Sequence, residues 1–116
     1  MADLGSAPGS GRLLGYFGVT DAGVIIGSTD EPRAWYYDGA FHLIPLPGSD
    51  NGNHASAINS SNEIVGYGSP SHHPFKFAIS GAVLTDLGVA KAGGGSWSQV
   101  QPLGINAGGD VVGWAQ

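Results

Sequence analysis

The chain has 116 residues, of which 21 are glycine, 7 are proline and none is cysteine, and 41% are hydrophobic. Four Lys and Arg against nine Asp and Glu give a formal net charge of −5, which excludes the basic surface that nucleic-acid binding requires. The lack of cysteine excludes disulfides, and no apolar run approaches the roughly 20 residues that cross a bilayer, so we expect no membrane partner.

The predicted elements are all short β-strands, because glycine recurs every few residues and no apolar stripe has helical spacing. Runs of β-branched and aromatic residues, separated by turn residues, mark the strands. In chain order they are expected at residues 13–19, 25–27, 33–39, 40–46, 54–58, 64–66, 73–81, 82–88, 98–105 and 111–113.

Three segments superimpose without gaps, and each is expected to form a tight turn followed by a strand. They are residues 18–27 (GVTDAGVIIG), 57–66 (AINSSNEIVG) and 104–113 (GINAGGDVVG), whose last residues lie 39 and 47 positions apart. Periods of roughly 20–50 residues are typical of repeat architectures. The sequence therefore predicts a repeat protein.

Each copy of this segment has three features with a physical meaning. Its sixth residue tolerates positive φ, as a tight hairpin loop demands; these residues are Gly23, Asn62 and Gly109. Two β-branched residues follow, and because neighbouring strand residues point to opposite faces, the pair predicts that both faces of the strand are covered. The last residue is always glycine, which predicts a close backbone approach or a bend at Gly27, Gly66 and Gly113.

A second repeated element is an aromatic strand that precedes a glycine turn and a returning strand. Trp35 and Tyr37 alternate with Ala34 and Tyr36, and the same period of two places Phe75 and Phe77 on one face of the later copy. We therefore predict that Trp35, Tyr37, Phe75 and Phe77 belong to the core.

Together these elements predict an all-β fold of repeated four-stranded antiparallel units in a single repeat domain, residues 1–116. The expected units are 1–29, which lacks its first strand, 30–69 and 70–116. Such units must stack on neighbours to bury their faces, so we predict β-propeller-like blades. Because propellers typically close with about four to eight blades, we expect a homo-oligomer that closes a ring of blades. The alternative is a three-sheet β-prism or a trefoil-like single domain.

The order of these motifs resembles the HAF repeat of predicted bacterial extracellular proteins. Ile58-Asn59, Ile105-Asn106 and the three glycine-terminated strands carry the resemblance, whereas His73-Pro74-Phe75 and Arg33-Ala34-Trp35 depart from the name-giving triplet. The resemblance covers nearly the whole chain and implies a repeat architecture and an extracellular location, without assigning an activity. The first residues, 1–5, lack the charged and apolar regions of a signal peptide, so the residues themselves assign no localisation.

No motif of a known catalytic site is present, and we expect that the chain is not an enzyme and uses no cofactor. A nucleophile elbow, a His-Glu-x-x-His motif and a Walker loop are all missing from the sequence. Asp30 and Glu31 are adjacent and diverge on an extended chain, as do His72 and His73. Residues 50–53 (DNGN) offer Ca²⁺ a single formal charge and are first a turn signal, so we expect no metal site.

Aromatic and polar residues of the loops and strand ends are the candidate ligand-binding residues: Trp97, Trp114, Tyr67, Asp50, Asn51 and His54. Flat rings beside amide and hydroxyl groups suit a sugar or a protein surface. We therefore predict a non-enzymatic binding module for a glycan or an extracellular protein. The alternatives are a purely structural assembly protein, in which Trp97 and Trp114 are buried between units, and a hydrolase that uses loop Asp and His residues.

Overall fold

The computed structural model describes residues 13–29, 33–46, 50–70, 73–88, 94–95 and 100–116, and for 13–17 the backbone alone. In this part of the chain the structure is all-β, as predicted, and contains no helix. The strands are β1 (Leu13–Val19), β2 (Ile25–Thr29), β3 (Ala34–Tyr37), β4 (Phe41–Leu43), β5 (Gly52–Ile58), β6 (Glu63–Ser69), β7 (Pro74–Ala78), β8 (Val83–Asp86), β9 (Val100–Ile105) and β10 (Val111–Ala115).

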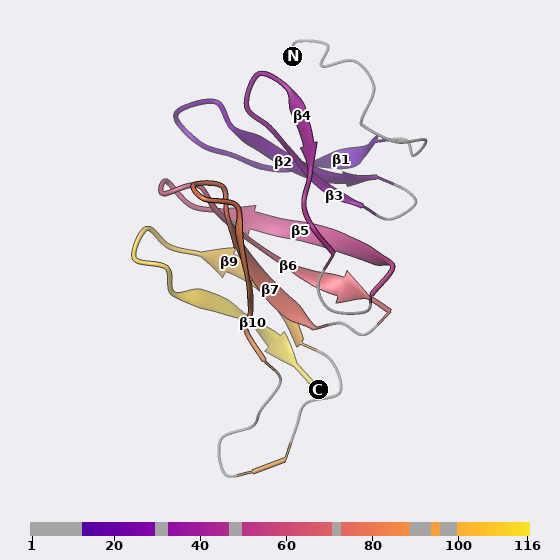
Figure 1. Ribbon diagram of the computed structural model, residues 1–116. Helices are drawn as coiled ribbons and strands as arrows, with labels where there is room; N and C mark the ends of the chain where they lie inside the picture. The colour runs from indigo at the N-terminus through magenta and orange to yellow at the C-terminus, as the bar shows by residue number, and fades with distance from the viewer. Residues whose placement is uncertain (1–12, 30–32, 47–49, 71–72, 89–93, 96–99) are drawn as a thin grey trace.

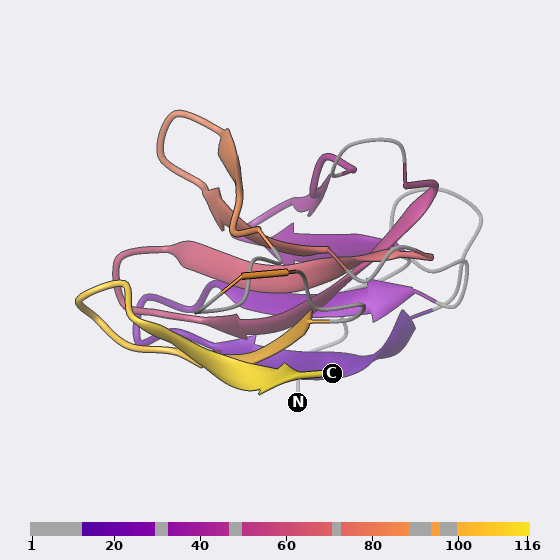
Figure 2. The same ribbon diagram turned by 90° about the horizontal axis from the view of Figure 1, so that it is seen from below.

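The strands form three antiparallel sheets, each ordered as the chain runs (Figure 1). The first sheet is β1-β2-β3-β4, the second is β5-β6-β7-β8, and the third holds β9 and β10. The described residues form no closed barrel or propeller. Figure 2 shows the β7–β8 hairpin projecting away from the stacked sheets.

The boundaries between the three sheets differ from the boundaries of the expected units 1–29, 30–69 and 70–116. The aromatic strand β3 pairs with the glycine-terminated strand before it, β2, and β7 pairs with β6 in the same way. A short connection returns the chain antiparallel beside the strand it has just left, so that strand becomes the neighbour. As a result the third sheet, not the first, has fewer strands among the described residues.

The three tight turns share one hydrogen-bond scheme, which confirms the predicted repeat at the level of the turn. The backbone N–H groups of Thr20, Asn59 and Asn106 donate to the carbonyl oxygen four residues later at 2.9–3.1 Å. Their side-chain oxygens accept the N–H of that same later residue. The predicted positive φ is found at the sixth position of each copy: Gly23 (+88°), Asn62 (+60°) and Gly109 (+89°).

A bulge in the strand before each turn explains the repeated closing glycine. The pairing register skips one residue directly after the partner of each closing glycine, at position 17 in β1, Ser56 in β5 and Leu103 in β9; β1 has a second skip at position 14. A Cβ atom on Gly66 would meet the carbonyl oxygen of His54, and one on Gly113 would meet the carbonyl oxygen of Gln101. The predicted close backbone approach is therefore confirmed at both glycines.

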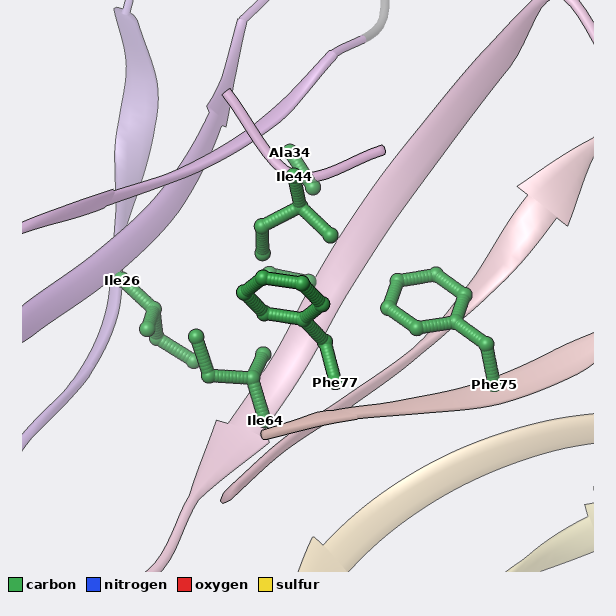
Figure 3. Packing of buried hydrophobic residues seen from close by; sticks show 7 residues of the cluster. Ile26, Ala34, Ile44, Ile64, Phe75 and Phe77 are labelled. Carbon is green, nitrogen blue, oxygen red and sulfur yellow. The ribbon is translucent and has the colours of Figure 1, made fainter. Parts of the chain in front are cut away.

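The hydrophobic core lies between the first and second sheets. Figure 3 shows side chains from the two sheets facing one another; the cluster consists of Ile26, Ala34, Ile44, Ala55, Ile64, Phe75 and Phe77. Of the predicted core aromatics, Trp35, Phe75 and Phe77 are buried, and Tyr37 is half-buried, with its ring 5.0 Å from that of Phe41. The prediction is confirmed for Phe75 and Phe77, whereas β3 turns its other face to this cluster: Ala34 belongs to it and Tyr36 packs against it.

Two polar residues join the first two sheets across this core. The Asn53 side chain is fully buried; its Oδ1 accepts the N–H of Ala34 at 2.8 Å, and its Nδ2 donates to the carbonyl oxygens of Ile44 and Pro45. The Ser28 hydroxyl accepts the N–H of Ala55 at 3.2 Å. Each bond satisfies a backbone group that burial would otherwise leave unpaired.

The spatial relation between the first two sheets recurs between the second and third. β5 lies against β1, β2 and β3, and β9 lies against β5, β6 and β7. Asn59 also donates from Nδ2 to the carbonyl oxygen of Asn106 at 2.9 Å, which ties two equivalent turns together. Successive sheets therefore stack through equivalent strands.

The expectation that every β-branched pair is covered on both faces is wrong for the third copy. Ile64 and Val65 are fully buried, but Val112 is 67% exposed and Trp114 is 40% exposed. The reason is that the second sheet has a neighbour on each side, whereas no further sheet of the described residues covers the outer face of β10.

Candidate functional site

The third sheet presents an apolar groove beside an unpaired strand edge. β10 pairs with β9 along one edge, and no strand of the described ranges pairs with its other edge. The groove, here called the β10 groove, has a volume of about 310 Å³. Its lining is mainly apolar and consists of Pro74, Leu87, Gly88, Val100, Pro102, Val111, Val112, Gly113, Trp114 and Ala115.

The residues of the β10 groove are held in place by the repeated backbone scheme. The N–H of Leu87 donates to the carbonyl oxygen of Pro74 at 3.0 Å, so the chain after β8 stays beside β7. On the side of the groove formed by the third sheet, Gly113 of β10 pairs with Pro102 of β9, and Ala115 pairs with Val100. The groove therefore lies between the second and third sheets.

A second cavity, the His54–Tyr67 pocket, lies where all three sheets meet. It has a volume of about 200 Å³ and is lined by Ser28, His54, Ala55, Ser56, Tyr67, Gln101 and Leu103. The rings of His54 and Tyr67 stack with centroids 4.8 Å apart, and burial raises the pKa of the Tyr67 phenol above its ordinary value. The phenol is therefore neutral at physiological pH and serves as a hydrogen-bonding group beside a stacked ring.

The structure separates the sequence-predicted candidates. His54 and Tyr67 line one pocket, whereas Trp114 lines the β10 groove. Asp50 is nearly buried and Asn51 is exposed, with its N–H donating to Ser69, and neither lines either cavity. Trp97 lies outside the described residues.

The residue after each closing glycine has a different role in each sheet. Ser28 is buried and bonds to the second sheet, Tyr67 is half-buried against His54, and Trp114 is the exposed member of the set. Their strand positions are equivalent, since each follows the glycine opposite the bulge. Exposure increases along this series because Ser28 bonds to the four-stranded second sheet, Tyr67 lies beside the third sheet, which has two strands among the described residues, and no further sheet of those residues covers Trp114.

Three charged residues lie around the second and third turns. Glu63 accepts from Asn59 Nδ2 at 2.8 Å and pairs with Lys76 at 3.4 Å. The Asn59 hydrogen bond, with a smaller contribution from Lys76, lowers the pKa of Glu63 below its ordinary value of 4.5. Asp110 occupies the position of Glu63 in the third copy; it is exposed and accepts from Asn106 at 3.1 Å.

Metal-ligating side chains do not gather in the part of the chain that the structure describes. No group of three His, Cys, Asp or Glu residues there is arranged to hold an ion. Asn53, part of the oxygen-rich loop considered for Ca²⁺, uses both its amide atoms within the fold. His42 bonds to Asp38 at 3.0 Å and stacks on Tyr36.

Sequence reasoning missed most of the β10 groove. Pro74, Leu87 and Pro102 come from segments far apart in the sequence, and none of them carries a motif. No signal in the sequence brings these residues together, because their meeting depends on how the second and third sheets stack.

Comparison of the chain with family models, curated proteins and solved structures gives no match. No helix in the described ranges is long and apolar enough to cross a membrane. The internal repeat allows one sheet to be compared with another, and this comparison is the physical basis for interpreting the β10 groove.

Proposed function

We propose that the chain is a non-enzymatic binding module of blade-like β repeats, and that the β10 groove receives an extended segment of a protein. The observation that carries the proposal is that one edge of β10, which no strand of the described residues pairs with, lies directly beside an apolar groove. An extended segment that adds to a sheet edge gains main-chain hydrogen bonds, and pockets for its alternate side chains give specificity.

The chemistry of the groove favours a protein segment over a glycan. Its lining consists of valine, proline, leucine, glycine and alanine with one tryptophan, so burial of apolar side chains in it is favourable. A sugar site would require several convergent hydroxyl, amide or carboxylate groups around the ring. Trp114, at 40% exposure, can cover the bound segment from one side.

The blade-like character of the repeats and their assembly belong to the same proposal. The equivalent packing of β5 and β9 on the sheets before them supports it. The HAF-repeat resemblance is also retained, since Asn59 and Asn106 of its Ile-Asn pairs provide the side-chain oxygens of the turns. A ring closed by several copies would appear as a multiple of the 11.7 kDa chain mass in light scattering.

The test uses the full chain with Trp97→Phe, so that Trp114 is the exposed reporter while Trp35 is fully buried. A panel of hairpin-forming peptides and a panel of neutral and acidic oligosaccharides are titrated against its fluorescence. The same titrations with Trp114→Ala provide the control.

We expect at least one peptide to shift the Trp114 emission saturably, and we expect this response to be lost in Trp114→Ala. A response to oligosaccharides alone would replace the proposal with glycan binding. If neither panel gives a response and iodide cannot quench Trp114 in an oligomer, the chain is a structural assembly protein and the proposal is overturned.

A further inference from the structure

We propose that the segment received by β10 is a β-strand with an aromatic–basic–aromatic pattern, which runs antiparallel to β10 in the register that β7 takes against β6. The inference rests on the proposed function and specifies its partner: a protein that supplies such a strand. Three independent features of the fold define the pattern, namely the register, the apolar groove and a carboxylate.

The first two sheets show how the edge of a glycine-terminated strand is filled in this fold. In the second sheet Phe75 pairs with Gly66 and Phe77 pairs with Ile64. In the first sheet Trp35 pairs with Gly27 and Tyr37 with Ile25. Both sheets therefore place one aromatic residue opposite the closing glycine and a second opposite the first β-branched residue.

The glycine is required at this position for the aromatic ring as well as for the bulge. A Cβ atom on Gly66 would lie 2.8 Å from Cζ of Phe75, closer than two carbon atoms can approach. β10 keeps a glycine at the equivalent position, Gly113. The same register therefore places the partner's first aromatic residue opposite Gly113 and its second opposite Val111.

The β10 groove lies on the face that these aromatic residues would occupy. Gly113 and Val111 line one side of the groove, and Pro74 of β7 and Leu87, which follows β8, line the other. In the interface between the first and second sheets, the corresponding aromatic residues are Phe75 and Phe77, which are 0% and 2% exposed. Two aromatic side chains in the β10 groove would complete the equivalent interface between the second and third sheets.

The basic residue of the pattern follows from a carboxylate that is paired with a lysine in the second sheet and whose position is again acidic in the third sheet. Lys76, between the two phenylalanines, pairs with Glu63 at the start of β6 at 3.4 Å. In the first sheet the position of Glu63 is Val24, and Tyr36 stands between the aromatics, so acid and base are both absent there. The third sheet has Asp110 at this position, which calls for a basic residue in the partner strand.

The probe is a synthetic peptide with the sequence of residues 73–88, which contains the β7–β8 hairpin. It is titrated against the full chain carrying Trp97→Phe, with Trp114 emission as one readout. The second readout is hydrogen exchange of the β10 amides. We expect saturable binding and slower exchange across residues 111–115, because their free edge gains hydrogen bonds.

Peptide variants test the register and the pattern. Phe75→Ala and Phe77→Ala, combined in one peptide, should weaken binding by at least about tenfold, because buried aromatic anchors dominate such interfaces. A shifted-aromatic peptide of the same composition, with the aromatics at adjacent positions 75 and 76, should also bind more weakly than the 73–88 peptide, since neighbouring strand residues face opposite sides in every register.

A charge exchange tests the role of Asp110. The Lys76→Glu peptide should bind the unaltered protein about fivefold more weakly. Asp110→Lys in the protein should restore the binding of this peptide. Asp21→Lys is the matched control, because it makes the same charge change at an exposed turn of the first sheet and should restore nothing.

Equal binding of the shifted-aromatic peptide, or no rescue by Asp110→Lys, would overturn the inferred pattern. Failure of the 73–88 peptide to bind would also overturn it. If another peptide of the broader panel still binds at Trp114, the proposed function stands and only the assignment of the partner fails.

Discussion

Gly66 and Gly113 occupy the same place in two different sheets, and the same physical constraint explains both. Each faces a bulge, where the carbonyl oxygen of the neighbouring strand approaches the Cα atom closely. Bulges sharpen the twist of a strand and redirect the side chains around them. The bulge therefore sets the direction of the side chain that follows each glycine, which is Tyr67 in the second sheet and Trp114 in the third.

The first prediction concerns Gly66. Gly66→Ala should lower the free energy of unfolding by about 3 kcal/mol, because the new methyl group meets both the His54 carbonyl and the Phe75 ring. Urea unfolding followed by circular dichroism measures the change. Gly108→Ala is the control, expected to change stability by less than about 0.5 kcal/mol, because its Cβ would meet only Asn106 Oδ1 at 3.5 Å. Similar losses for both variants would contradict the bulge explanation.

At the scale of the element, one asparagine closes the turn from β5 to β6, bonds to the Glu63 carboxylate and connects this turn to the next sheet. Asn59 Oδ1 accepts the N–H groups of Ser61 and Glu63, and its Nδ2 donates to Glu63 and to the carbonyl oxygen of Asn106. The turn is thus fixed internally and bonded to the equivalent turn of the next sheet. These part-buried bonds contribute to stability, because without the Asn59 side chain the backbone groups that it bonds to lose this partner.

The pH dependence of stability provides the second prediction. The pKa of Glu63 in the folded chain lies below 4.5, first because of the Asn59 hydrogen bond and then because of Lys76. Its contribution to stability is therefore complete above about pH 4.5 and is lost as the pH falls through the folded pKa. Glu63→Gln should lower the Tm at pH 7, and this difference should shrink toward pH 3.

Thermal unfolding at both pH values measures this effect, and Lys76→Met separates its causes. Because the Asn59 hydrogen bond is the largest single cause, Lys76→Met should keep part of the pH dependence that Glu63→Gln removes. A Tm difference between Glu63→Gln and the unaltered chain that is the same at pH 3 and pH 7 would contradict the assignment.

At the scale of the whole molecule, stability is expected to be uneven across the three sheets. The second sheet packs against a neighbour on each side, and Ile64, Val65 and Phe75 are fully buried. The third sheet has two strands in the described ranges, and Val112, Trp114 and Leu103 are exposed. Two-stranded sheets are marginal on their own, so the third sheet depends on the second for its order.

Hydrogen exchange provides the third prediction. Amides of β6 and β7 should exchange slowest, and those of β9 and β10 should exchange fastest among the strands that the structure describes, because opening of the third sheet exposes little apolar surface. Mass spectrometry of peptic fragments measures the order. Protection of β10 equal to that of β6 in the chain without added peptide would show that its edge is already covered.

The strands and turns could be predicted because their causes are local. Positive φ at Asn62 and Gly109 follows from residue type and turn length, and the inward face of Phe75 and Phe77 follows from the period of two. The sheet boundaries could not be predicted in this way. Whether the aromatic strand β7 joins the strand before it or begins a new unit depends on pairing across a loop, and both choices fit the same pattern.

By itself the sequence determined an all-β repeat, its three equivalent turns and most of its core aromatics, because these features depend on backbone preferences and side-chain alternation over a few residues. Only the tertiary structure decided which strands share a sheet, that Val112 and Trp114 face outward, and that Pro74, Leu87 and Val111 meet in one groove. Those outcomes depend on how many neighbours each sheet has, and that number is set by stacking between segments distant in the chain.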